Sequence, residues 1–180
     1  MKNLAAYLGV DLPISYRVNQ VAVTERMPRI VDTIVGVSTG LLTLKQSANG
    51  TVLIGGGWQG IGNLDRGGYQ IVSDNLIGNM RLAKYAAPGL ADARIVRTWL
   101  GLEAHVPDFM PLVGDLPGVD NAFIIGCVRG GFTIGPMMGM LMAQYILGQQ
   151  PEMPIFDPSR SIESEPGSQA EETLTGERVL

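Results

Sequence analysis

The sequence predicts an α+β fold, in which an antiparallel or mixed sheet carries its helices on one side. Three stretches support this prediction. Residues 14–25 are rich in β-branched side chains with partial alternation, residues 41–54 indicate a hairpin, and residues 122–148 indicate a strand, a glycine turn and a helix. The predicted order of helix, strand, hairpin, helix, strand, strand and helix is typical of this class.

The stretch 122–148 organises the rest of the chain. Ala122–Ile125 is a short apolar run that suits an interior strand. After a glycine turn, we expect the helix to begin at Gly135, with Pro136 at its first position, where no amide proton is needed. Gly148 is a natural C-terminal stop. The turn itself contains Gly126, Gly130 and Gly131.

The predicted helix has two distinct faces. Its broad apolar face consists of residues that recur at helical spacing, namely Ile134, Met137, Met138, Leu141, Met142, Tyr145 and Ile146. A second stripe contains only small residues, Gly135, Gly139 and Ala143. Because small residues leave the backbone accessible, this stripe would let another backbone or a flat ligand come close.

The glycine turn is the part of this stretch that can carry chemistry. A glycine turn before a helix presents unpaired amide protons and the positive end of the helix dipole. Such a terminus can receive an anion or an electron-rich ring edge, and Arg129 adds a positive charge beside it. The alternative is a tight strand-to-helix connection whose glycines only relieve steric crowding. Spacing alone leaves both interpretations open.

The N-terminal part of the chain contains a helix, a strand and a hairpin. Residues 1–9 predict a helix that ends at Gly9, and Leu4, Leu8 and the alanines form its apolar side. In the hairpin, Asn49-Gly50 supplies the positive φ angles that the turn needs. Three glycines precede Trp58, which indicates either a strand end that passes close to something flat or bulky, or a flexible loop.

A second helix and a further strand follow. Ser73-Asp74 predicts a helix N-terminus, and Pro88-Gly89 ends the helix after about Ala86. Residues 94–102 predict a strand, and residues 103–114 a turn-rich connector. The residues of the helix that we expect to face inward are Leu76, Ile77, Met80, Ala83 and Ala87.

Composition excludes several classes of function. The net charge of −4 is accounted for by the residues from Asp157 onward, so the rest of the chain is neutral and offers no basic footprint for nucleic acid. No uninterrupted apolar run is long enough for a membrane span. The N-terminus lacks a signal-peptide pattern. The single cysteine, Cys127, fits a reducing compartment, so we expect a cytoplasmic protein.

The common catalytic motifs are absent or lack their structural context. There is no P-loop and no H-E-x-x-H. The letters of G-x-G-x-x-G occur at 55–60 and those of G-x-S-x-G at 36–40, but neither string leads directly into a predicted helix, which both motifs require. With one histidine and one cysteine, we expect no dedicated zinc site. His105 has no obvious serine or cysteine partner in the sequence, and we expect it to be structural or exposed.

Residues 97–148 resemble the C-terminal segment of the D-amino-acid oxidase-like family of FAD-dependent oxidoreductases. That family includes glycine oxidase, sarcosine oxidase, D-amino-acid dehydrogenases and the opine or hydroxyproline dehydrogenase subunits, and the wording Gly-Leu-Glu-Ala at 101–104 is most similar to the last group. The upstream segment 4–25 is also similar, so the resemblance extends to about Phe156. The matching positions are Trp99, Gly101, Pro107, Asp108, Pro111, Gly114, Gly126, Gly131 and Pro136.

The resemblance implies where the flavin and the substrate would lie. In such proteins the turn after the last strand lies against the flavin, and the helix N-terminus points at its pyrimidine edge. The substrate-binding candidates are Arg129, Glu103 and Trp58, and no side chain is expected to act as a catalytic base. The resemblance assigns the flavin contacts to Gly126, Arg129, Gly130, Gly131, Phe132 and Thr133.

Three departures from the family pattern matter. The N-terminal dinucleotide-binding half is missing from the sequence. Glu103 stands where glycine-oxidase-like members carry an arginine that holds the substrate carboxylate, which a glutamate cannot do, whereas Arg129 matches a second family arginine that could. Some sarcosine oxidases tether flavin through a cysteine at the position of Gly101. Because Cys127 lies elsewhere, we expect non-covalent FAD.

The resemblance therefore predicts a fragment or subunit of an FAD-dependent oxidoreductase for an amine or a D-amino acid-like substrate. Hydride transfer from the substrate Cα to flavin N5 would give an imine. We expect a substrate-domain portion at 1–100, a flavin-contacting strand-turn-helix at 101–156 that would complete an FAD-binding domain, and a mobile acidic tail at 157–180. The missing half would be the partner. The alternative is a non-catalytic remnant or partner subunit.

The composition of the tail predicts that residues beyond about Ser161 are dispensable, because they are poor in large apolar side chains. Truncation after Ser161 should leave the melting temperature unchanged, as measured by circular dichroism. A large drop in melting temperature would show that the tail docks on the rest of the chain.

Overall fold

The computed structural model describes residues 1–37, 41–64 and 66–162. Contacts divide the described residues into two compact units, one built from residues 1–16 and 104–162 and the other from residues 17–103. The predicted division at residue 100 treated residues 1–16 as part of the sheet domain. Their grouping with the C-terminal segment depends on contacts about ninety positions apart, such as Ser15 with His105, which local patterns do not reveal.

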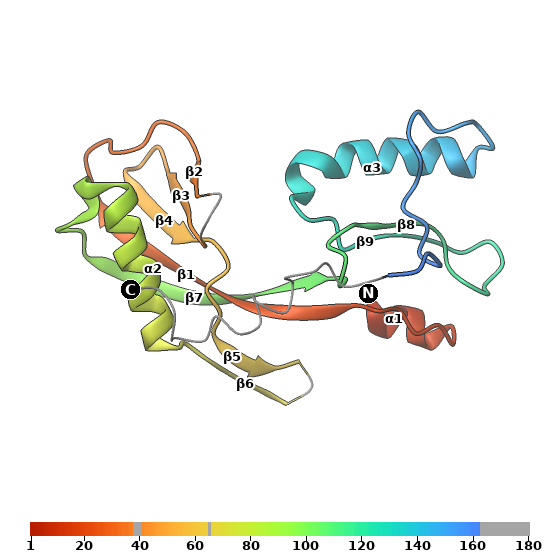
Figure 1. The fold of residues 1–180 in the computed structure, drawn as a ribbon, viewed down its shortest axis with the longest axis horizontal. Coiled ribbons are helices and arrows are strands. Elements are labelled where there is room, and N and C mark those ends of the chain that lie inside the picture. The colour runs from red at the N-terminus through yellow and green to blue at the C-terminus, as the bar shows by residue number, and fades with distance from the viewer. Residues whose placement is uncertain (38–40, 65, 163–180) are drawn as a thin grey trace. The chain divides into compact units, whose positions relative to one another are not determined.

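The unit of residues 17–103 is built on a five-stranded sheet (Figure 1). The strand order is β2-β3-β4-β1-β7, and the pairs β2–β3, β3–β4 and β4–β1 are antiparallel. The predicted α+β class with an antiparallel sheet is confirmed. The strands are β2 (Val35–Gly36), β3 (Thr43–Gln46), β4 (Thr51–Gly55), β1 (Ser15–Arg26) and β7 (Ile95–His105), and β5 (Ile61–Asn63) with β6 (Gly67–Gln70) forms a separate ribbon.

The predicted hairpin is β3–β4, but its turn differs in detail. Gly50 has φ +90°, as expected, and a Cβ there would lie 2.7 Å from the Met27 carbonyl oxygen. Asn49 does not adopt a positive φ. Instead, its side-chain oxygen accepts hydrogen bonds from the amide and the hydroxyl of Thr51 at 3.0 and 2.9 Å. Only one left-handed residue is therefore needed to close this turn.

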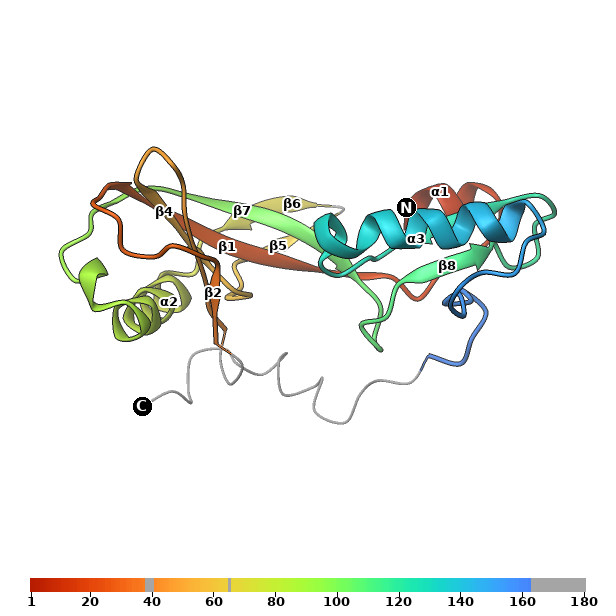
Figure 2. The ribbon, with the colours of Figure 1, turned by 90° about the horizontal axis from the view of Figure 1, so that it is seen from above.

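Helix α2 (Ser73–Ala86) covers one face of the sheet (Figure 2). The bounds of the predicted helix are correct, and the 3-10 turn at Pro88–Leu90 follows it. Along β1, alternate residues from Val18 to Thr24 are buried, as the period of a strand requires. The core beneath α2 is Ala22, Leu42, Leu44, Val52, Ile54, Ala83, Ala87 and Leu90.

The predicted inward face of α2 was partly wrong. Ile77 is 48% exposed, whereas Asn75 and Asn79 are buried. Asn75 donates to the Gln59 carbonyl at 2.7 Å, and Asn79 donates to the Gly55 carbonyl at 3.1 Å. These amides bind main-chain carbonyls at and beyond the end of β4, so polar residues take the place of apolar ones. The N-cap position belongs to Val72 rather than to Ser73.

The other unit contains a two-stranded ribbon between two helices (Figure 1). Strands β8 (Leu112–Asp115) and β9 (Phe123–Gly126) are antiparallel. Leu112 packs into a cluster with Ala5 of helix α1 (Lys2–Tyr7), whereas its neighbour Val113 packs against helix α3 (Gly131–Ile146). The ribbon therefore has an apolar contact on each face. Leu4 and Leu8, expected on the apolar side of α1, are 67% and 56% exposed.

Helix α3 starts five residues earlier than Pro136 suggested. Gly130 adopts φ +65°, and its carbonyl accepts the amides of Thr133 and Ile134 at 2.8 and 3.2 Å, which sets the helix start. Pro136 lies inside the helix, near its exposed first turn. The predicted stop is confirmed: Gly148 has φ +68° and donates to the Tyr145 carbonyl at 3.0 Å, as in a Schellman motif.

A mostly buried ion pair ties the segment after α3 to the turn before β8. Arg160 Nε and Nη2 donate to the two Asp108 carboxylate oxygens at 2.9 and 3.1 Å, and both side chains are about one-fifth exposed. Residues 157–162, predicted as the start of the mobile tail, are therefore packed, both through this ion pair and through Ile162, which lies against the cluster around Leu112. The rest of the predicted tail, 163–180, lies outside the described residues.

No helix in the described ranges is long and apolar enough to cross a lipid bilayer.

We expect Arg160→Ala to destabilise the fold by about 2 kcal/mol, because it leaves a partly desolvated carboxylate without its charge-assisted hydrogen bonds. The matched control is Arg29→Ala, which removes an ion pair to Asp32 whose side chains are 51% and 93% exposed, and should cost about 0.5 kcal/mol or less. Urea unfolding of both variants measures the difference. Equal losses would contradict the stabilising role of Arg160.

Candidate functional site

The turn between β9 and α3 is open on its outer side. Gly130 lies in the left-handed region, and a Cβ built on it would meet nothing within 4 Å. A Cβ on Gly131 would touch only the Val128 side chain, at 3.8 Å. Within this unit, therefore, no neighbouring atom requires a glycine at position 130 or 131. Only the left-handed backbone angle of Gly130 favours one. The open space is available to a ligand that approaches the backbone.

The N-terminus of α3 has no compensating charge or cap. Among the described residues, no side chain caps the helix, and its first turn contains no acidic residue. The first amides of any helix lack an intrahelical acceptor, and the helix dipole places partial positive charge at this end. An anion or an electron-rich ring edge placed here would gain both hydrogen bonds and favourable electrostatics.

Arg129 is held beside this helix end by an aromatic ring. Its guanidinium carbon lies 5.1 Å from the centre of the Phe109 ring, within cation–π range. The Phe109 ring also stacks on His105 at 5.7 Å with an interplanar angle of 14°. His105 Nε2 is hydrogen-bonded to the Ser15 hydroxyl at 3.0 Å. Ser15 is thus a serine partner that the sequence did not indicate for His105. The histidine is part of the packing that supports Arg129, which is the structural role expected of it.

Five of the six predicted flavin contacts are adjacent in this turn, and the sixth is not exposed. Arg129, Gly130, Gly131, Phe132 and Thr133 are consecutive and exposed, and the Phe132 side chain is completely so. Gly126 instead is buried at the end of β9, paired with Leu112. A Cβ on Gly126 would meet the sulfur of Met1, which is the far end of a flexible side chain and can move aside, so contacts within this unit do not require a glycine at this position.

The two other predicted substrate residues belong to the other unit. Glu103 Oε2 accepts a hydrogen bond from Asn19 Nδ2 at 2.6 Å. The Trp58 indole donates to the Leu41 carbonyl at 2.6 Å, and its ring packs on Gly78, where a Cβ would come within 2.6 Å. Of the three glycines before Trp58, Gly56 makes the close approach that they indicated, because a Cβ there would lie 2.5 Å from the Leu42 backbone.

Sequence reasoning missed Asn19, Phe109 and Arg160. Asn19 and Arg160 act through partners 84 and 52 positions away, so no local pattern marks them. Phe109 was detectable in part, because it follows Pro107-Asp108 in a turn. Its φ of +56° could not be foreseen, since few non-glycine residues adopt it.

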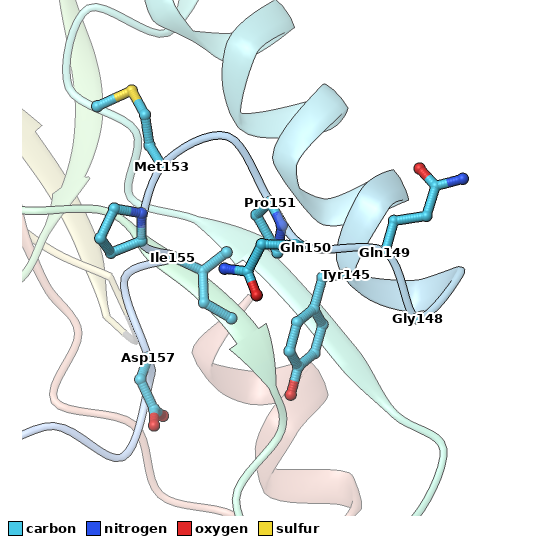
Figure 3. A pocket seen from close by; sticks show the side chains of 9 residues that line it. Tyr145, Gly148, Gln149, Gln150, Pro151, Met153, Ile155 and Asp157 are labelled. Atoms are coloured by element: carbon cyan, nitrogen blue, oxygen red, sulfur yellow. The ribbon is translucent and has the colours of Figure 1, made fainter.

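A separate pocket of about 560 Å³ lies at the opposite end of α3 (Figure 3). Tyr145, Gln150 and Asp157 are among its lining residues. The Tyr145 hydroxyl donates to the Asp115 carboxylate, and this hydrogen bond raises the pKa of Tyr145. Since α3 is about 24 Å long, this pocket does not belong to the glycine turn.

Comparison with known proteins identifies relatives over most of the chain. Residues 2–145 match the DAO family model, described as FAD dependent oxidoreductase. Sarcosine oxidase subunit beta of Rhizobium meliloti is 26% identical over 150 residues, which cover 83% of this chain and 35% of that protein. An uncharacterized oxidoreductase of Bacillus subtilis, YurR, is 38% identical over 79 residues, 42% of this chain and 21% of the relative.

Solved structures of an oxidase and a dehydrogenase superpose on this fold. The structure of L-proline dehydrogenase from P. horikoshii superposes with a TM-score of 0.69 and 25% identity, over 87% of this chain and 42% of that one. Glycine oxidase from Geobacillus kaustophilus gives a TM-score of 0.68 at 18% identity, over 89% and 43%. The chain thus spans less than half of the length of each of these four proteins.

Cys127 lies in the turn but is not set up as a reactive thiol. It is half-buried and packs against the cluster around Leu112 and Ile124. Burial raises the pKa of the Cys127 thiol, partly opposed by the positive charge of the chain N-terminus. Because a raised pKa favours the neutral form, the nucleophilic thiolate is scarce at neutral pH.

We expect Cys127 to react with Ellman's reagent at least about tenfold more slowly in the native chain than in urea at the same mildly alkaline pH, because the thiolate is the reacting species. The matched control places a cysteine at the exposed Ala48 in a Cys127→Ala background (Ala48→Cys), and this thiol should react at the unfolded rate. Rapid native labelling of Cys127 would show that the turn opens or that the thiolate is stabilised.

Proposed function

The chain belongs to the DAO family of FAD dependent oxidoreductases, and on that premise we propose that it forms the substrate side and flavin-contacting turn of an amine or amino-acid oxidoreductase. The observation that supports this most is the end of α3. It is uncapped, free of acidic residues in its first turn, open above Gly130 and flanked by the Arg129 guanidinium.

The turn fits one edge of a flavin. The pyrimidine edge of the ring is electron-rich and gains negative charge on reduction, so amide donors and a helix dipole stabilise it. Arg129, Gly130, Gly131, Phe132 and Thr133 would hold this edge. Gly126 would act indirectly, because it is buried behind the turn. In this proposal the FAD is held without a covalent bond, since Gly101 offers no thiol and the pKa of Cys127 is raised by burial.

Bound FAD would supply a two-electron acceptor for oxidation of the substrate Cα–H, with an imine as the product. The residues of this chain would bind and orient the substrate, and no side-chain base is required. Arg129 would hold a substrate carboxylate, because its planar fork matches two carboxylate oxygens. The Phe109 ring leaves the N–H edges of this guanidinium available for such a contact.

Glu103 and Trp58 are proposed as further substrate contacts with narrower roles. A carboxylate repels a second carboxylate, so Glu103 and its partner Asn19 would suit the amine end of a substrate. The Trp58 N–H is already engaged by the Leu41 carbonyl. Only its ring could therefore contact a ligand, through apolar or cation–π interaction.

The proposed cofactor needs a second binding region. A dinucleotide requires a site for its pyrophosphate and its adenosine ribose, which a glycine-rich strand-to-helix turn and a following carboxylate normally provide. The G-x-G-x-x-G string at 55–60 leads into strand β5 rather than into a helix, and the matched segments make up 35% and 42% of two of the relatives. We propose that polypeptide outside these 180 residues supplies this region.

A second candidate function is a non-catalytic binding subunit. The large apolar side chains at the two ends of α3 support it, since Phe132, Ile146 and Leu147 are at least half exposed. Both candidates expect a partner on this helix. They differ in flavin contact, so flavin titration separates them.

We expect the chain alone to bind FAD, FMN and lumiflavin with the same weak affinity. The Kd should lie above about 1 μM, because without the pyrophosphate site the binding free energy should be no more favourable than about −8 kcal/mol. Quenching of flavin fluorescence measures it, and Arg129→Ala should weaken all three equally. Arg97→Ala is the control, because Arg97 stacks on Trp99 in the other unit. Much tighter binding of FAD than of lumiflavin would mean that the chain holds a complete dinucleotide site. No response with any flavin would favour the binding subunit.

In the enzyme reconstituted with its dinucleotide-binding region, Arg129→Lys should raise KM by about tenfold or more, because the bidentate contact is lost. Arg97→Lys is again the matched control and should leave KM unchanged. Steady-state kinetics with a carboxylate-bearing amine substrate measure the effect. An unchanged KM in Arg129→Lys would remove this residue from the substrate site.

A further inference from the structure

We propose that Phe109 is a positioning residue, whose ring sets the orientation of the Arg129 guanidinium at the end of α3. The consequence for substrate binding rests on the proposed function, but the positioning itself rests on contacts within one unit. Phe109 lies in the turn before β8, whereas Arg129 lies in the turn after β9.

The backbone of Phe109 is strained and is held from both sides. A φ of +56° is uncommon for any residue with a Cβ and is costly for a bulky one. The residue before it, Asp108, is bound by Arg160 through two hydrogen bonds. The residue after it, Met110, donates its amide to the Asp108 carboxylate at 3.0 Å, and its carbonyl accepts a hydrogen bond from Arg160 at 3.3 Å. One guanidinium therefore fixes both neighbours of Phe109.

The Phe109 ring is fixed by contacts with its neighbours. It stacks on His105, which is in turn hydrogen-bonded to Ser15, and it lies 5.1 Å from the Arg129 guanidinium carbon. Exposed arginines sample many rotamers, and restricting them costs conformational entropy. A preformed ring contact lowers the freedom that Arg129 would lose when it binds an anion, so the guanidinium is partly organised in advance.

A ring contact, unlike an ion pair, leaves the N–H donors of the Arg129 guanidinium available to a ligand. A carboxylate partner would use the N–H fork of Arg129, whereas a ring face contacts the guanidinium plane. Among the residues that the structure describes, no carboxylate pairs with Arg129, while Arg160 directs its donors at Asp108 and at main-chain carbonyls. Arg160 thus stabilises the fold, whereas Arg129 keeps its donors for a ligand.

The test is side-chain NMR of the full chain, with the Arg129 signals assigned by their loss in Arg129→Lys. The Phe109 ring current should move the Arg129 side-chain protons upfield of unstacked arginine values. Phe109→Leu should abolish this shift, Phe109→Tyr should retain it, and Phe109→Trp should enlarge it. Phe123→Leu is the matched control, because the Phe123 ring packs against Tyr145 instead.

Sodium acetate supplies a second readout on the same signals. Acetate should perturb Arg129 in the parent and in Phe109→Tyr, and Phe109→Leu should weaken this response severalfold. If Phe109→Leu does not fold, Phe109→Tyr and Phe109→Trp still decide the matter. An Arg129 shift that is unchanged in Phe109→Leu or in Phe109→Trp overturns the proposal. A ring-current effect without any acetate response supports positioning and counts instead against the carboxylate role in the proposed function.

Discussion

The pair of Asp108 and Arg160 is the interaction on which the C-terminal unit depends. It joins the turn before β8 to the segment after α3, 52 residues later. Arg160 also donates to the carbonyls of Phe156 and Asp157, and the Phe156 carbonyl accepts the Val113 amide at 2.8 Å. The returning segment thus adds a main-chain hydrogen bond to the edge of β8. Because both charged groups are mostly buried, neither can lose the other without a desolvation penalty.

A second constraint comes from α3, which contains no charged residue. Its inner side packs through Met138, Leu141 and Met142 against the ribbon. Elsewhere it bears exposed large apolar side chains and two glycines, Gly135 and Gly139, with nothing within 4 Å of an added Cβ. A helix that is apolar all round is normally buried. The same helix therefore meets the ribbon through its large residues and offers its small ones for close approach by something else.

The parts of the fold that could be predicted are those that local chemistry determines. The alternation of β1, the turn at Gly50 and the helix stop at Gly148 each depend on neighbouring residues. The parts that could not be predicted depend on distant partners or on unusual backbone angles. Asn75 and Asn79 are buried because they donate hydrogen bonds to main-chain carbonyls. Pro136 falls inside α3 because Gly130 sets the helix start ahead of it. Residue propensities contain no information about the position of these carbonyls or about the left-handed conformation of Gly130.

The candidate site shows the same division between local and distant causes. The glycine turn and its helix end are visible in the sequence, because a few consecutive residues suffice to form them. The orientation of Arg129 is not visible, because it requires a ring from residue 109, a backbone angle that few residues adopt, and an ion pair from residue 160. Glycines leave a turn free to move, whereas binding an anion requires fixed donors. A rigid aromatic neighbour, anchored by a mostly buried charge pair, supplies that rigidity without occupying the space that the glycines keep open.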